Sequence, residues 1–503
     1  MGECNKRAAA PSSRVAVDTF AGRIQVEWDP DAAVTPLGQL PFFIEFLKVS
    51  GLYESFVADC PLQYSSPNAP KVRDVLGTLL LSVLAGHKRY AHITTIRTDR
   101  VNPELLGMTG VASEDSVRRA LSQFDEAEAV TWLDRHLAVC SRPVLGLAPW
   151  VLDTDNTVKP LYGKQEGAEI SYNPQKPGRP SHAYHSYLMG NTRLALGVEV
   201  APGNQHTGKH VSIGLWKLLD DLPRELWPKF IRGDISFGTE PIMHEAEERN
   251  LHYLTKLKLT SNVKKAINRL IDRGEWVDAG HGFRGAESRI QLTGWTKSRR
   301  IIVLKRRIQG EVLITDNQLN LAFIETTKDG ISKYEYQVLV TSMQDEILTI
   351  AQHYRDRGDS ENCFDELKNQ WGWGGFTTKD LQRCRIISRL VALVYNWWSL
   401  YTRLLNPDKR HEAITSRPLM LESVGRKTSH AGQTTVTITS SHAKTTVIQT
   451  ATRELTAFFK ELARTAEQLG IAERITLIAK RAYRKMLPIL NPAEGLKLLP
   501  STG

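Results

Sequence analysis

Three aspartates stand where short apolar runs end, a position at which a strand presents side chains at the edge of a sheet. The run that starts at Trp150 leads to Asp153 and Asp155, which are two residues apart and therefore lie on one face of a strand. A later run, 230–234, ends in Asp234. Carboxylates in such places can bind a hard divalent metal ion, but an aspartate that closes a strand is more often a turn or cap residue.

A second group of polar side chains lies between residues 354 and 368. Tyr354, Arg357, Glu361 and Lys368 are separated by three, four and seven residues, so one helix covering all four would align them on a single stripe. One carboxylate between two cations and a phenol suits a site that holds a metal ion beside phosphates. The alternative is a solvated helix face with ion pairs between successive turns.

These residues carry a resemblance to a known family. The pattern Y-x-x-R-x-x-x-E-x-x-x-x-x-x-K at 354–368 follows Asp-x-Thr at 155–157 and Arg-x-Asp-x-x-Phe at 232–237, and together they resemble the YREK signature of DDE insertion-sequence transposases. The segments 162–168, 172–174 and 178–181 are similar to the branch named after insertion sequence thirteen-eighty. The resemblance runs from about residue 38 to 450. One departure is Asp-Ile-Ser-Phe at 234–237, where the family has Asp-Ser-Gly-Phe.

The resemblance implies an RNase H-like catalytic core in which three carboxylates bind two Mg²⁺ or Mn²⁺ ions. Carried over residue by residue, the three ligands and catalytic groups are Asp155, Asp234 and Glu361. Asp153 is the alternative for the first place, because it shares the strand face with Asp155 but lacks the Asp-x-Thr context. The reaction implied is DNA strand cleavage followed by transfer of the freed 3′-hydroxyl, with no covalent enzyme intermediate.

The resemblance also implies DNA contacts. Tyr354, Arg357 and Lys368 are expected to hold phosphates near the cut. In relatives that form a DNA hairpin, a tryptophan of the inserted domain stacks on a flipped base. Trp295, which precedes Arg299 and Arg300, is the candidate here, and Trp276 is the alternative. A tryptophan beside basic strands is otherwise a core residue under a solvated face.

A further candidate for DNA binding lies near the N-terminus. Ser113 and the acids after it precede a predicted helix in which Val117, Leu121 and Phe124 point inward while Arg118 and Arg119 point outward. This pattern is typical of the second helix of a helix-turn-helix. A basic, solvated face on a capped helix explains the same pattern equally well.

Composition supports a folded protein with a polyanionic partner. Apolar residues make up 41% of the 503, and the formal net charge of +10 would attract nucleic acid. The longest uncharged apolar stretch, 390–402, is shorter than the roughly 20 residues that a membrane span needs. Five cysteines without a C-x-x-C pair argue against a disulfide framework or a cysteine-ligated zinc site. We therefore expect no membrane partner, and the resemblance implies a prokaryotic, nucleoid-associated protein of the cytoplasm.

The elements that must position these residues follow from periodicity. Residues 38–145 predict helices, and the runs 150–153, 184–189, 194–200, 230–234 and 253–257 predict strands, with helices at 209–221 and 238–249. Strands are again predicted at 289–292, 300–304, 312–315 and 336–340. A long helical run starts at about 345 and continues through Trp398, followed by a strand at 434–439 and two helices within 450–485.

These elements predict an α/β fold class with a β-rich insertion, and the resemblance implies that the interrupted core is RNase H-like. The domains expected are a helical N-terminal DNA-binding domain (1–145), the first part of the core (146–260), the insertion (261–342), the second part of the core with the YREK helix (343–405) and a mostly helical C-terminal region (406–503) that could dimerise. The long stretch between Asp234 and Glu361 exceeds a plain crossover and fits such an insertion.

The resulting hypothesis is a cut-and-paste transposase that binds double-stranded DNA, both terminal inverted repeats and target, as a homodimer on paired ends. Two other functions share the motifs: a DNA-binding protein derived from such an enzyme that has lost catalysis, and a metal-dependent nuclease without strand transfer. The presence of all three acids and of the YREK pattern favours the active transposase.

Overall fold

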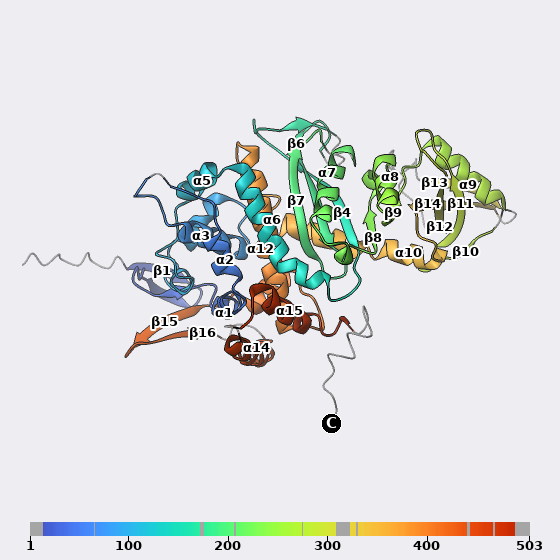
Figure 1. Ribbon diagram of the computed structural model, residues 1–503. Coiled ribbons are helices and arrows are strands. Elements are labelled where there is room, and N and C mark those ends of the chain that lie inside the picture. The colour runs from blue at the N-terminus through green and yellow to red at the C-terminus, as the bar shows by residue number, and fades with distance from the viewer. Residues whose placement is uncertain are drawn as a thin grey trace, which may run out of the picture.

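The computed structural model describes residues 14–64, 66–171, 176–205, 208–273, 275–307, 322–327, 330–439, 443–465 and 468–487. Up to residue 145 the described chain is helical, apart from a hairpin and a short strand (Figure 1). Its elements are β1 (Val15–Thr19), β2 (Gly22–Val26), β3 (Val34–Thr35), α1 (Leu40–Ser50), α2 (Leu52–Ala58), α3 (Val72–Leu84), a 3₁₀ turn (Tyr90–Ile96), α4 (Asn102–Leu105), α5 (Glu114–Gln123) and α6 (Glu126–Leu145). The helices predicted for this part of the chain are confirmed.

Local sequence explains where two of these helices begin. The Ser113 side chain accepts a hydrogen bond from the Ser116 N–H at the start of α5, and Asp125 does the same for the Glu128 N–H at the start of α6. Such caps satisfy backbone donors that have no partner inside the helix. Helix α3 has no cap of this kind, but its apolar residues are buried along nearly its whole length, so tertiary packing fixes it.

A large mixed sheet follows. Its strands lie in the order β10-β11-β12-β14-β9-β8-β4-β6-β5, with β7 on β6 and β13 on β14. Strand β4 is central: it pairs in parallel with β8 and antiparallel with β6, and β8 pairs in parallel with β9. The first elements are β4 (Leu152–Pro160), β5 (Glu169–Ile170), β6 (Pro180–Met189), β7 (Leu194–Pro202), α7 (Gly208–Asp220), β8 (Phe230–Gly233), α8 (Glu240–Glu248) and β9 (His252–Lys256). The α/β fold class is confirmed.

The strands predicted between residues 286 and 341 extend this sheet, because β14 pairs antiparallel with β9. They are β10 (Val277–Asp278), β11 (Arg284–Ile290), β12 (Arg299–Arg307), β13 (Ala322–Thr327) and β14 (Gly330–Thr341), and they lie after α9 (Ser261–Arg273). In Figure 1 they form, with α9, a lobe at the right of the molecule. The predicted strand at 312–315 lies outside the described residues.

The helical run after residue 345 is interrupted twice, which corrects the prediction of one long run. It consists of α10 (Ile347–Arg355), α11 (Gly358–Asn369) and α12 (Leu381–Leu405). The first break falls at residues 356–357, so the predicted single helix through Tyr354 and Lys368 is wrong. The second break contains Gly372, whose φ of 101° cannot occur in a right-handed helix.

Helix α12 is the longest described helix, and nearly all of its residues after Cys384 are buried. It packs on strand β7 at one side and on helix α6 at the other. The Asn396 side chain binds both backbone groups of Ala195, accepting from the N–H (2.8 Å) and donating to the carbonyl (2.7 Å). This amide replaces a missing strand partner at the edge of the sheet, so α12 joins the sheet to the N-terminal helices.

The C-terminal elements return to the beginning of the chain. They are α13 (Ala413–Met420), β15 (Gly425–His430), β16 (Gln433–Ile438), α14 (Thr445–Thr465) and α15 (Ile471–Ala482). Strand β15 pairs with β3, α14 packs on α1, and α15 packs on α6 and α12, as Figure 1 shows. None of the described helices combines the length and apolar character required to cross a bilayer.

A buried ion pair joins the two central parallel strands. Arg232 of β8 donates to both carboxylate oxygens of Asp153 on β4, at 2.5 and 2.7 Å. The same arginine donates to the His353 carbonyl in α10, and the Ser360 hydroxyl in α11 donates to Asp153. Both charged side chains are almost completely buried. The pair therefore fixes the register of β4 and β8 and the position of both helices on them.

This pair generates a stability prediction. Arg232→Met should destabilise the protein by about 3–5 kcal/mol, because it leaves the Asp153 carboxylate buried without its counter-ion. Arg23→Met is the matched control, since Arg23 forms an exposed ion pair with Asp18 and should change stability little. Urea denaturation of both variants measures the difference. Similar, small losses of stability in both would contradict the structural role of the buried pair.

Candidate active site

Strands β4 and β8 bring Asp155 and Asp234 side by side. Asp153 lies opposite Arg232 in the parallel ladder, and Asp155 and Asp234 follow two residues later on each strand. Residues two apart share a face, so both carboxylates lie on the face that carries α10 and α11. The charge of Asp234 contributes to a raised pKa of Asp155, as expected for neighbouring carboxylates.

Helix α11 supplies the third carboxylate. The break after α10 makes Arg357 the residue that precedes α11, and its guanidinium lies between two acids. It donates to Asp155 Oδ1 at 2.9 Å and also pairs with Glu361, one turn further along. Glu361 itself remains exposed over 62% of its side chain. The structure thus brings Asp155, Asp234 and Glu361 into one electrostatic cluster around Arg357.

Burial dominates the electrostatics of Asp155. It raises the pKa of this carboxyl group; Asp234 and Glu361 act in the same direction, whereas the Arg357 charge and a hydrogen bond from Thr157 oppose it. The Thr157 hydroxyl donates to Asp155 Oδ2 at 2.9 Å. Asp155 is therefore held in place through both oxygens, and an additional cation nearby would stabilise its charged form.

Asp234 is oriented by the turn that follows it. Its Oδ1 accepts the Ser236 N–H at 2.9 Å, and this bond caps the 3₁₀ turn Ile235–Phe237. The sequence Asp-Ile-Ser-Phe differs from the pattern of the resembling transposases, yet it forms a capped turn that leaves the second oxygen of Asp234 without a described hydrogen bond.

Tyr354 also faces this cluster. Burial raises its pKa to about 12, and its phenol responds to the charges of Arg357, Asp234 and Glu361. Lys368 lies near the other end of α11, where it lines a small cavity with Thr157 and Trp373. The break at residues 356–357 therefore separates Tyr354 from the helix that carries Glu361 and Lys368, although all of them remain on the same side of the sheet.

Asp153 is not an alternative to Asp155. Both of its oxygens are bound by Arg232, and Ser360 donates to it as well. A fully buried carboxylate with these partners has no free oxygen for a metal ion. Its role is to hold β4, β8 and α11 together.

The two arginines predicted to bind DNA from the added strands are both paired with acids of the protein. Arg299 is buried and paired with Glu240 and Glu247, so its predicted DNA contact is wrong. Arg300 pairs with Glu287 and donates to the carbonyls of residues 343 and 345. The sequence did not indicate these partners, because they lie on other elements.

The two tryptophans considered for base stacking are packed in the protein. Trp295 is partly buried against the core, with the Arg299 guanidinium 5.2 Å from its ring centre. Trp276 is buried, donates its indole N–H to the Leu270 carbonyl and has the Lys305 ammonium over its ring. Burial of its ring argues against Trp276, whereas Trp295 is only partly buried and its base-stacking role stays a prediction.

Helix α5 has the two faces that its sequence predicts. Val117 and Leu121 are buried, and Arg118 and Arg119 are exposed. The Arg118 guanidinium lies over the Tyr90 ring at 5.3 Å, and Arg119 donates to the Asp115 carbonyl. No carboxylate within the described chain pairs with either arginine, so both charges are available to a polyanion.

Sequence reasoning missed Lys256, which stands on β9 at the level of Asp234 on β8. The ladder pairs Arg232 with Leu254 and Gly233 with Thr255, so Lys256 comes next to Asp234. The sequence shows Lys256 only as a charged residue inside the apolar run 253–257, and its nearness to Asp234 depends on the parallel register.

The donor set at this site suits a hard divalent cation, since it consists of carboxylate oxygens on three elements whose charges act on one another. Within the described residues, no group of three acid, histidine or cysteine side chains is arranged at present to bind a metal ion. The Arg357 guanidinium provides the positive charge between Asp155 and Glu361. The residues fit two Mg²⁺ or Mn²⁺ ions in chemistry, and Arg357 would have to yield its place.

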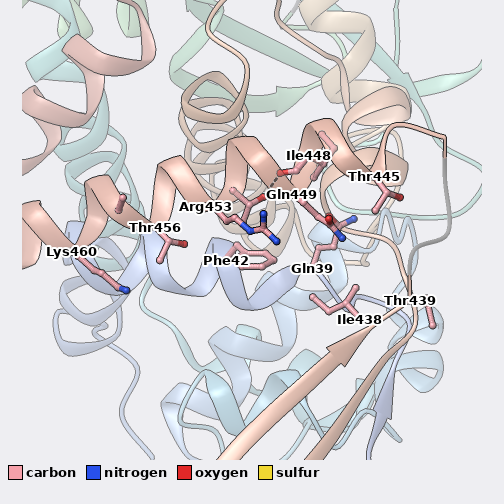
Figure 2. A pocket seen from close by; sticks show the side chains of 12 residues that line it. Gln39, Phe42, Ile438, Thr439, Thr445, Ile448, Gln449, Arg453, Thr456 and Lys460 are labelled. Carbon is pink, nitrogen blue, oxygen red and sulfur yellow. Dashed lines mark hydrogen bonds between the residues drawn. The ribbon is translucent and has the colours of Figure 1, made fainter.

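A groove of about 610 Å³ lies elsewhere, between α1 and α14 (Figure 2). Figure 2 shows Arg453 of α14 reaching toward Phe42 of α1, with Gln39 beside it. Among the described residues that line the groove there is no acid, histidine or cysteine. The groove therefore offers no carboxylate, imidazole or thiol from a described residue, and the carboxylates on β4, β8 and α11 remain the candidate site.

Comparison with known proteins adds two findings. A family model described as transposase DDE domain group 1 matches residues 45–459, which include Asp155, Asp234 and Glu361. The cryo-electron microscopy structure of the piggyBac transposase synaptic complex with hairpin DNA is similar at 11% sequence identity and a TM-score of 0.39, over 88% of this chain and 85% of that chain. No curated protein matches the chain.

The position of Arg357 predicts a pH-dependent stability difference. The fold raises the pKa of Asp155, so the stability linked to this group is present at low pH and is lost as pH rises through the folded-state pKa. The Arg357 charge limits this loss. Arg357→Gln should therefore cost about 1–3 kcal/mol near pH 7.5 and less near pH 4.5, because protonation of Asp155, which is favoured as pH falls, removes the charge that Arg357 offsets.

Thermal midpoints of wild type and variant at both pH values test this expectation. Arg224→Gln is the control, because Arg224 donates to the backbone carbonyls of Arg249 and Asn250, which do not titrate. Its cost should not depend on pH in this way. An equal cost of Arg357→Gln at both pH values would contradict the coupling to Asp155.

Proposed function

The chain belongs to the transposases with a DDE domain of group 1, and we propose that it is an active DNA transposase that excises a mobile insertion sequence and joins it to target DNA. Within this family we assign it to the YREK group and to the branch of insertion sequence thirteen-eighty. The observation that carries the proposal is the cluster of Asp155, Asp234 and Glu361, which come from three distant elements and influence one another electrostatically.

In the proposed RNase H-like core, these three carboxylates would hold two Mg²⁺ or Mn²⁺ ions. When bound, the ions supply an activated water or 3′-hydroxyl and neutralise charge on the leaving oxygen. The chain itself orients the ligands: Thr157 holds one oxygen of Asp155, and the Ser236 N–H holds one oxygen of Asp234. Such fixed ligands favour in-line attack on a phosphodiester because little reorganisation is needed.

The polar residues around the carboxylates are proposed to hold the DNA backbone. Arg357 is directed at the acids, and the metal ions would free its guanidinium for a phosphate, for which a planar donor group is well suited. Tyr354 faces the same cluster. Lys368, at the far end of α11, is proposed to contact a phosphate further along the strand.

Sequence-specific recognition of the terminal inverted repeats is assigned to the helical N-terminal domain, residues 1–145, with α5 in the major groove. The support is the exposed pair Arg118 and Arg119 on a helix whose opposite face is buried. The other proposed parts are the core in two segments, 146–260 and 343–405, separated by residues 261–342, and a C-terminal region from 406. A homodimer acting on paired ends in a prokaryotic cytoplasm completes the proposal.

The carboxylates generate the central test. Asp155→Asn, Asp234→Asn and Glu361→Gln should each reduce cleavage of a labelled terminal-repeat duplex on the order of a thousandfold or more, because each removes a ligand that acts on the reacting phosphate. Binding of the uncut duplex should persist. Asp365→Asn is the control, since this exposed acid on α11 contacts Asn369 and should leave cleavage unchanged.

The products and variants also separate the alternatives. Cleavage without joining of the 3′ end to a target plasmid identifies a nuclease, and binding without cleavage by the wild type identifies a protein that has lost catalysis. Cleavage by Asp155→Asn at the wild-type rate would remove Asp155 from the metal site.

The assignment of α5 predicts a loss of discrimination. Arg118→Ala and Arg119→Ala should each weaken binding to terminal-repeat DNA about tenfold, and should weaken binding to random DNA less, because each substitution removes a hydrogen-bonding group for base edges as well as a charge. Lys48→Ala removes an exposed charge from α1 and serves as the control. Affinities measured in one buffer on both duplexes decide the matter. An equal weakening on both would assign α5 to backbone contact alone.

A further inference from the structure

Lys256 completes a row of charged residues across three parallel strands. Asp153, Arg232 and Leu254 face one another on β4, β8 and β9, and the next residues on the same face are Asp155, Asp234 and Lys256. Because partners in a parallel ladder share a face, the lysine side chain emerges beside Asp234, on the side that carries α11. The row therefore consists of two candidate metal ligands, Asp155 and Asp234, followed by the cation Lys256.

The surroundings of Lys256 are unusual for a lysine. Its side chain is partly buried, and no ion pair or hydrogen bond links it to any residue in the described part of the chain. Burial lowers its pKa, while the charges of Glu361, Glu335 and Asp234 favour its protonated form and Arg357 opposes it. The ammonium group thus responds to two of the three candidate ligands without contacting either closely.

The other cation of the cluster, Arg357, is already hydrogen-bonded within the protein. Arg357 donates to Asp155 and Glu361, so its donors serve the protein itself. Lys256 keeps all three of its N–H donors for another partner. A partly desolvated ammonium without a partner is unfavourable, and a phosphate oxygen brought to this edge of the sheet would relieve that cost.

We propose that Lys256 binds a non-bridging oxygen of the DNA phosphodiester held next to Asp155, Asp234 and Glu361. The inference rests on the proposed function, because it requires DNA to enter this site. It adds a DNA-binding residue from β9 to those on α10 and α11, so the backbone would be gripped from both sides of the carboxylates. A compact ammonium suits a single phosphate oxygen, whereas the arginine suits two.

The competing explanation is that Lys256 only offsets the negative charge of the acids within the folded protein. In that case Lys256→Met would change the thermal midpoint or the metal affinity, and it would leave the salt dependence of DNA binding unchanged. A lysine that binds a phosphate has the opposite signature: its removal lowers the slope of log affinity against log salt by about 1.

The test uses the full chain with Lys256→Met, Lys256→Arg and the control Lys258→Met, which changes an exposed lysine two residues further on. Binding of a terminal-repeat duplex is measured over a range of KCl concentrations in a Glu361→Gln background, so that the DNA is not cut. Cleavage with Mg²⁺ and thermal midpoints are measured in the otherwise wild-type chain.

We expect Lys256→Met to reduce cleavage at least about tenfold, to lower the salt slope by about 1 and to keep its thermal midpoint, while Lys256→Arg restores most of both DNA readouts. Lys258→Met should match the wild type. Wild-type cleavage and salt slope in Lys256→Met would overturn the inference and leave the transposase proposal intact. Absence of cleavage by the wild type would overturn both.

Discussion

The buried pair between Asp153 and Arg232 is the interaction on which the site depends. A buried ion pair contributes little net stability, because desolvation of the two charges offsets their attraction. Its effect is geometric: the bidentate contact aligns β4 with β8, while Ser360 and the His353 carbonyl attach α11 and α10 to the same point. Asp155 and Asp234, two positions further along these strands, are therefore held next to each other.

A second buried ion pair holds the opposite side of α11. Glu366 is bound by Arg410, by the indole N–H of Trp371 and by the Ala413 N–H. Ser360 therefore anchors the start of the helix and Glu366 its last turns, each to a different part of the protein. Held at both ends, α11 presents Glu361 to the sheet without depending on the exposed side chain itself.

The charges of the site follow from this rigid frame. Asp155, Asp234 and Glu361 repel one another, and burial of Asp155 adds to the cost of its charge. Arg357 lies between Asp155 and Glu361 and reduces this repulsion. Lys256 on β9 adds a second positive charge beside Asp234. In the proposed function, the carboxylates would attract divalent cations and the basic side chains a polyanion, which is the combination that a phosphodiester reaction requires. The net positive charge of the chain acts in the same direction.

The sequence by itself determined the local features. The capped, two-faced helix α5, the apolar runs of β4 and β8 and the acids that follow them can be read from spacing, because each depends on residues a few positions apart. Only the tertiary structure decided which charges are available. Asp153 looks like Asp155 in sequence, but a buried arginine from another strand neutralises it. Arg299 and Arg300 look like free basic residues, but both are paired with acids on other elements. The break before α11 and the place of Lys256 likewise depend on the packing of helices on the sheet and on the register of parallel strands, since neither can be specified by the neighbouring residues alone.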